Sequence, residues 1–67
     1  MKIRYVLTTA FDQFTHHVGD TETLEEIILG LTDNQDLATR VTCIASHMQL
    51  GDGFAAPGLM LTCEEDK

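Results

Sequence analysis

The segment from Asn34 to Leu50 constrains the fold more than any other, because it is the longest stretch with helical periodicity. Its apolar residues fall at positions i, i+4, i+7 and i+11, which places them in one stripe along a helix: Leu37, Val41, Ile44 and Met48. Such a stripe has to be buried against other apolar surface. The segment therefore predicts an amphipathic helix that closes one side of a small hydrophobic core.

A second helical pattern precedes this segment. Its apolar residues lie at i, i+3, i+4 and i+7, and are Leu24, Ile27, Ile28 and Leu31. Asp20, Thr21 or Thr23 is expected to cap the helix, and Gly30 to end it or to lie in its last turn. Because only a few capping residues separate the two patterns, the helices should form a tight hairpin.

The remaining segments predict a small sheet. Lys2–Thr9 alternates β-branched, aromatic and polar residues and is expected to be a strand. Ala10–Gly19 suits a second strand paired with the first, with a plain loop as the alternative. Phe54–Gly58 is expected to be a loop and Leu59–Cys63 a last strand, with a frayed, solvated tail at Glu64–Lys67.

Together these elements predict an α+β fold of order β(β)ααβ. We expect residues 1–67 to form a single compact domain with a small, mainly antiparallel sheet of two to three strands. The two amphipathic helices should pack on one face of that sheet.

The charge of the chain is strongly acidic, with eleven Asp and Glu against four Lys and Arg and a formal net charge of -7. Direct nucleic-acid binding is disfavoured, because phosphate contacts need clustered basic residues. A larger basic protein is the more plausible partner, although the charge also serves solubility. The acids between Arg4 and Arg40 are the predicted partner-binding residues: Asp12, Asp20, Glu22, Glu25, Glu26, Asp33 and Asp36.

A polar line on the second helix offers an alternative function. Cys43 and His47 are spaced i, i+4 and could share a metal ion or an activated thiol. A structural metal site needs four ligands, however, and no paired motif supplies the others. The simpler interpretation is a solvated helix face on which Asp36 and Arg40 form an ion pair.

The other candidate groups give weaker signals. His16 and His17 point to opposite faces if their segment is a strand, so they could chelate together only in a loop. Adjacent glutamates such as Glu25 and Glu26 lie in solvated runs, where nothing separates their pKa values for acid–base catalysis. We therefore expect no catalytic residues, no bound metal and no cofactor.

The expected location is the cytoplasm. The N-terminal apolar run is interrupted by Thr8 and Thr9 and is too short for a signal peptide, and no segment has the length of a membrane span. The two cysteines, Cys43 and Cys63, are then expected to be reduced packing residues.

The leading hypothesis is a small acidic interaction module that binds and modulates, or inhibits, a larger basic protein. One form of it is an inhibitor that mimics nucleic-acid phosphates with carboxylates, by analogy with small proteins of phages and mobile elements. Besides the metal or thiol site, a structural homodimer formed through an exposed strand edge is the remaining alternative.

Overall fold

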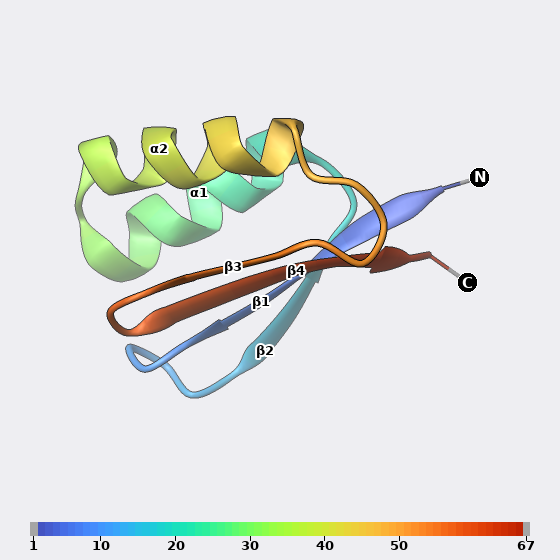
Figure 1. The fold of residues 1–67 in the computed structure, drawn as a ribbon. Helices are drawn as coiled ribbons and strands as arrows, with labels where there is room; N and C mark the ends of the chain where they lie inside the picture. Colours follow the sequence, from blue (N-terminus) through green and yellow to red (C-terminus); the bar gives the residue numbers. More distant parts are fainter. Residues whose placement is uncertain (1, 67) are drawn as a thin grey trace.

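The computed structural model describes residues 2–66 of the chain. Within these residues, six elements follow one another in the order β1 (Ile3–Thr9), β2 (Thr15–Val18), α1 (Thr21–Thr32), α2 (Gln35–Ser46), β3 (Gly53–Ala56) and β4 (Leu59–Glu65). The two helices lie side by side over one face of the sheet, and the other face is left uncovered (Figure 1). This arrangement confirms the expected α+β fold with both helices on one face.

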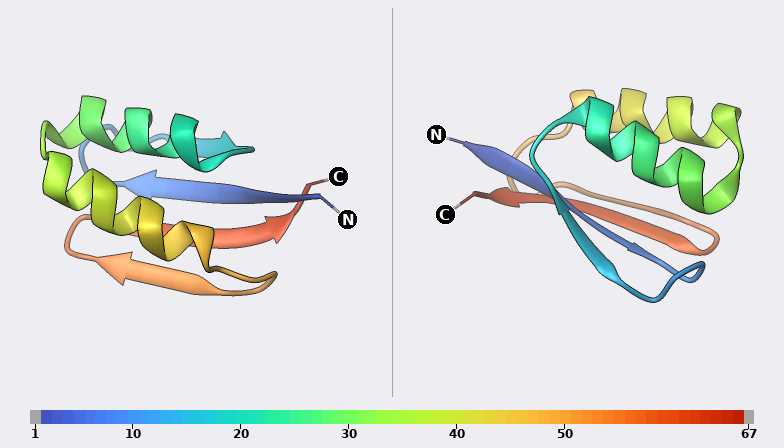
Figure 2. Two further views of the ribbon diagram at one scale, coloured as in Figure 1. Left: turned by 90° about the horizontal axis from the view of Figure 1, so that it is seen from above. Right: turned by 180° about the vertical axis from the view of Figure 1, so that it is seen from behind.

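The sheet has the strand order β2-β1-β4-β3, and every neighbouring pair is antiparallel. The first and last strands are thus its central pair, with Leu7 opposite Leu61 and Tyr5 opposite Cys63. Seen from above the helices, α1 covers the β2–β1 side of the sheet and α2 the β4–β3 side (Figure 2). The chain therefore forms two hairpins that flank a helical hairpin.

The fourth strand differs from the sequence prediction, which placed a loop at 54–58 and allowed two to three strands. Residues 53–56 pair with β4, from Gly53 opposite Thr62 to Ala56 opposite Leu59. This strand carries only small residues and one phenylalanine, so it lacks the alternation that marks an amphipathic strand. Gly51, at φ 92°, adopts the left-handed conformation that starts the return of the chain toward β4.

The predicted frayed tail is also wrong for its first two residues. β4 continues through Glu64 and Glu65, which pair with Arg4 and Ile3 of β1. The Arg4 guanidinium donates to the Glu64 carboxylate at 2.7 Å, so one ion pair fastens the two ends of the described chain together. Lys67 lies outside the described residues.

Side-chain caps set the start of each helix. The Asp20 carboxylate accepts a hydrogen bond from the Thr23 backbone N–H at 2.7 Å, and Asn34 accepts one from Leu37 N–H at 3.1 Å. Asp33 adopts the left-handed conformation at φ 51° and ends the first helix, whereas Gly30 stays inside it. These short polar residues explain how the two helices reverse direction so tightly.

The second helix is shorter than the predicted segment, because it ends at Ser46. Met48 nevertheless stays buried beyond the helix, so the apolar stripe closes the core as expected. The core lies between the helices and the inner sheet face, and its largest fully buried side chains come from both layers: Leu7, Leu24, Ile28, Val41 and Leu61.

Truncating a core leucine should cost far more stability than truncating an exposed one. Leu24 is fully buried, whereas 47% of the Leu50 surface is exposed. We expect Leu24→Ala to lower the free energy of unfolding by about 2–5 kcal/mol, because it leaves a cavity. Leu50→Ala should cost about 1 kcal/mol or less. Urea denaturation of both variants measures the difference, and equal costs would contradict this description of the core.

Candidate functional site

The helical layer collects five of the seven predicted partner-binding acids. Glu22 and Glu26 lie one turn apart on the exposed side of α1. Glu25 is half-buried beside α2, where its carboxylate accepts a long hydrogen bond from Gln35 at 3.5 Å. Two exposed aspartates lie at the link between the helices. We call this set the acidic helical face: Glu22, Glu25, Glu26, Asp33 and Asp36.

The other two predicted acids have structural roles. The hydrogen bond from Thr23 N–H lowers the pKa of the Asp20 carboxyl, which favours the charged form at the start of α1. Asp12 lies in the turn between β1 and β2, in the sheet layer and not in the helical layer (Figure 1). Both carboxylates are committed within the fold, so they are poorer candidates for contacting a partner.

Three groups converge on Asp12 and hold its carboxylate in the turn. His16 Nε2 lies 2.6 Å from Oδ2, while Thr9 Oγ1 and the Phe14 backbone N–H donate to Oδ1 at 2.9 and 3.1 Å. The hydrogen bond with His16, helped by those from Phe14 and Thr9, lowers the pKa of Asp12. The cluster fixes the hairpin by bridging its two strands.

The two histidines of β2 lie on opposite faces of the sheet, as the strand interpretation predicts. His16 is opposite Leu7, on the inner face, and His17 is opposite Val6, on the outer face. They therefore cannot chelate one ion together. The His16 Nε2 atom is also already hydrogen-bonded to the Asp12 carboxylate.

Basic groups are nearly absent from the helical layer. Arg4 lies on the outer face of the sheet and pairs with Glu64, with Asp66 a further 3.9 Å contact. Arg40 is exposed on α2, and within residues 2–66 it forms no ion pair, so the expected pair with Asp36 is not made. The field of the acidic helical face is therefore opposed by one guanidinium only.

The Cys43 and His47 pair does not assemble a metal site. His47 Nδ1 lies 2.9 Å from the Cys43 backbone carbonyl oxygen and 3.1 Å from Ser46 Oγ, so the ring caps the end of α2. Among the described residues, no three His, Cys, Asp or Glu side chains converge as metal ligands would. The i, i+4 spacing of Cys43 and His47 therefore lets the His47 ring bind the Cys43 carbonyl at the end of α2.

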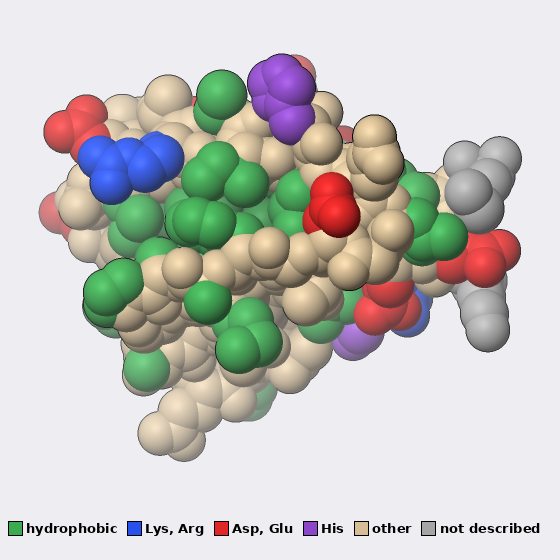
Figure 3. Space-filling view, in the orientation of Figure 1, with side chains coloured by type: hydrophobic (Ala, Val, Ile, Leu, Met, Phe, Trp, Pro, Cys, Tyr) green, Lys and Arg blue, Asp and Glu red, His purple; other side chains and the backbone are tan. Residues whose placement is uncertain are grey.

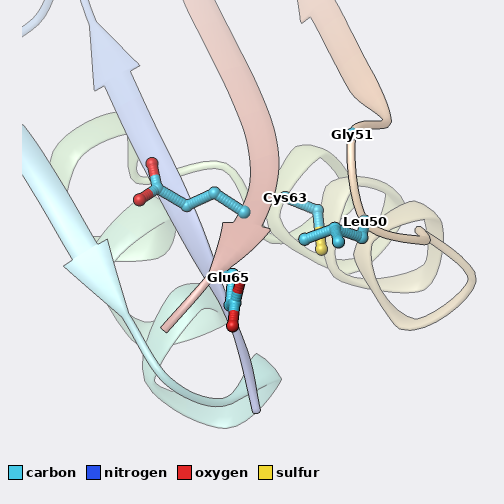
Figure 4. Close-up of a pocket in the computed structure, with 5 residues that line it drawn as sticks. Leu50, Gly51, Cys63 and Glu65 are labelled. Atoms are coloured by element: carbon cyan, nitrogen blue, oxygen red, sulfur yellow. The ribbon is translucent and has the colours of Figure 1, made fainter. Parts of the chain in front are cut away.

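A shallow hollow of about 470 Å³ lies where the loop before β3 meets the end of β4. Figure 4 shows Leu50 beside the Cys63 sulfur in this hollow, with Glu65 at its side. Burial raises the pKa of the Cys63 thiol, which keeps it protonated and weakly nucleophilic. The hollow therefore joins an apolar floor to surface carboxylates and contains no evident nucleophile–base pair.

The edge strand β3 is the surface that sequence reasoning missed. Hydrophobic side chains gather between α2 and β3 and continue below the strand (Figure 3). Phe54 and Ala56 are only partly buried on the inner side, and Met60 is 55% exposed on the outer side. No sequence signal marked this surface, because it exists only once β3 joins the sheet edge.

Comparison with known proteins adds no identity, since no family model, curated protein or solved structure matches the chain. In the part of the chain that the structure describes, neither helix has the length and apolar character needed to traverse a bilayer. Function has to be inferred from the surfaces themselves.

The two thiols should differ sharply in reactivity. Cys43 is exposed, whereas Cys63 is 2% exposed in the core. We expect a thiol-specific chromogenic reagent to modify Cys43 in the native protein and Cys63 only on unfolding. Cys43→Ser should remove the reaction seen in the native protein, and Cys63→Ala should leave that reaction intact. Two thiols that react at the same rate in the native state would contradict the placement of Cys63.

The Asp12 cluster should make stability depend on pH. Since the pKa of Asp12 is lowered in the folded state, its stabilisation is present above the unfolded value of about 3.9 and is lost as pH falls through the folded value. We expect Asp12→Asn to lower the unfolding midpoint at pH 7, with the deficit shrinking below about pH 4. Thermal unfolding monitored by circular dichroism across this range measures the effect.

The matched control is Asp36→Asn, because Asp36 is exposed and makes no side-chain hydrogen bond with any residue from 2 to 66. Its effect at pH 7 should be smaller than that of Asp12→Asn. A deficit for Asp12→Asn that stays constant down to pH 3 would contradict the proposed origin of the stabilisation.

Proposed function

We propose that this protein is a non-enzymatic, cytoplasmic interaction module that docks its acidic helical face on a basic surface of a larger protein and thereby modulates it. The observation that carries the proposal is the concentration of charge. Five carboxylates and a single guanidinium, that of Arg40, lie in the helical layer from 21 to 46.

The scaffold supports this use of the carboxylates. Glu22 and Glu26 project from one helix about 6 Å apart along its axis. Because α1 is anchored by Leu24 and Ile28 in the core, its backbone loses little freedom when a partner binds. A rigid helix backbone and a single-sign field together favour fast, electrostatically steered association.

The same arrangement suits inhibition of a nucleic-acid-binding protein. A groove that binds phosphates presents Lys and Arg side chains, which carboxylates on a rigid helical scaffold can engage in place of the nucleic acid. This specific form of the proposal predicts competition: the protein and a short DNA or RNA duplex should exclude each other from the partner.

Neutralising the acidic helical face should weaken partner binding selectively. The test variant is Glu22→Gln combined with Glu26→Gln, which removes two exposed charges and keeps the side-chain volumes. The partner is first captured from a lysate of the source organism on immobilised wild-type protein, and its association is then measured by surface plasmon resonance. We expect the association rate constant of the double variant to fall about tenfold at low salt.

The matched control removes two charges outside the helical layer, at and just after the end of β4, with Glu65→Gln and Asp66→Asn, both at exposed residues. Its association rate should stay within about twofold of the wild type. Binding that is insensitive to salt between 0.05 and about 0.5 M, or equal losses for the two double variants, would sink the proposal.

A further inference from the structure

We propose that two copies of this chain form a symmetric dimer by antiparallel pairing of their β3 strands, which joins the two sheets into one. The surface involved is distinct from the acidic helical face, so this proposal does not rest on the one above. We call it the β3 edge surface, and it comprises Leu37, Arg40, Ile44, Asp52, Gly53, Phe54, Ala55, Ala56 and Met60.

The backbone of β3 has unused hydrogen-bonding groups on its free side. Cys63 N–H donates to the Asp52 carbonyl at 3.0 Å, and hydrogen-bonded pairs alternate with non-bonded pairs along an antiparallel ladder. Phe54 and Ala56 therefore bond to β4, whereas the N–H and C=O groups of Gly53 and Ala55 point to the open edge. Strands with such an edge are templates for further pairing.

Within β3 itself, two features that usually prevent pairing are absent. Residues 53–56 contain no charged side chain and no proline, and Pro57 follows only at the turn. The opposite edge, β2, carries His16 and His17 and is followed closely by the charged cap Asp20. Of the two edges, β3 is the one better suited to pair with another strand.

Apolar side chains flank the β3 edge above and below. Leu37 and Ile44 lie on the side of α2 away from Gln35, which contacts Glu25 of α1. Like Phe54 on the inner side of β3, both are only partly buried against the core. Figure 3 shows hydrophobic side chains gathered between α2 and β3. Below the strand, Gly53, Ala55 and Met60 line a hollow of about 210 Å³ that is almost wholly apolar. Pairing would bring the partly buried apolar residues of the two helical layers toward each other across the joined β3 edges.

The charges at the ends of this surface identify a second copy as the occupant. α2 and β3 run in opposite directions, so the first half of α2, with Arg40, lies above the end of β3, while Asp52 immediately precedes its start (Figure 1). A two-fold axis through antiparallel β3 strands brings Arg40 of each copy toward Asp52 of the other. Asp52 Oδ2 accepts from Gln49 N–H at 2.8 Å, which leaves Oδ1 for the partner's guanidinium.

The surface is thus self-complementary, as an isologous interface must be. Because each β3 contributes only four residues, the contact belongs among the small, weak interfaces. Dimerisation should therefore depend on concentration over the micromolar to millimolar range.

Sedimentation equilibrium of the whole chain tests the proposal directly. We expect the weight-average mass to rise from 7.4 kDa toward twice that value as concentration increases. Ala55→Pro removes an N–H that faces the open edge without removing a hydrogen bond to β4, so it should abolish the rise. The matched control is His17→Pro, which should leave the rise in mass unchanged. The register and the bond from Ala10 N–H to the Gly58 carbonyl place the His17 N–H at the free edge of β2.

A second variant tests the charge pairing without changing the backbone. Arg40→Glu turns both ion pairs into repulsions and should raise the dimer dissociation constant about tenfold. Lys2→Glu changes the net charge by the same amount at a residue far from Arg40. It should raise the dimer dissociation constant less than threefold. Circular dichroism confirms that each variant is folded.

Three results would overturn the proposal. The first is a mass of 7.4 kDa at every concentration. The second is a dimer that survives Ala55→Pro in the folded state, or a dissociation constant that Arg40→Glu raises no more than Lys2→Glu does. The third is a dimer that His17→Pro abolishes as completely as Ala55→Pro, which would place the contact elsewhere.

Discussion

The pairing of β1 with β4 is the interaction on which the rest of the structure depends. These strands come from the two ends of the chain, yet they form the centre of the sheet and hold Leu7 and Leu61 against the helices. The ion pair between Arg4 and Glu64 spans 60 positions of sequence. Since no local segment can bury the helical stripe alone, the core closes only when both ends of the chain have joined the sheet.

This central pair also determines which surfaces remain available. Each outer strand is joined to a central strand by a hairpin, and the helical hairpin crosses over the inner face. The helices consequently display their charged sides to solvent, and the sheet keeps one bare face and two open edges. Charge and apolar surface are thereby partly separated: five of the eleven carboxylates lie in the helical layer, whereas residues 53–56 of β3 carry no charge.

The sequence predicted correctly those helices and strands in which the spacing of the apolar residues follows the side that is buried. Leu24 and Val41 belong to apolar stripes with a 3.6-residue period, and both are fully buried. β3 could not be predicted, because its pairing comes from β4 and not from its own residues, as Phe54 and three small neighbours show. The sequence identified the acidic residues only as a group. The structure was needed to show that the Asp12 carboxylate contacts His16, whereas the carboxylates of Glu22 and Glu26 point to solvent.

The two proposed surfaces should respond oppositely to ionic strength. Each copy carries a net charge of -7, so two copies repel each other over distances longer than the contact between Arg40 and Asp52. At 0.1 M salt the Debye length is about 10 Å, which suppresses this long-range repulsion more than an ion pair in contact. Moderate salt should then favour the dimer, whereas it weakens attraction between the acidic helical face and a basic partner. Because residues 53–56 are uncharged and the acidic helical face lies on other residues, one small domain can carry both surfaces.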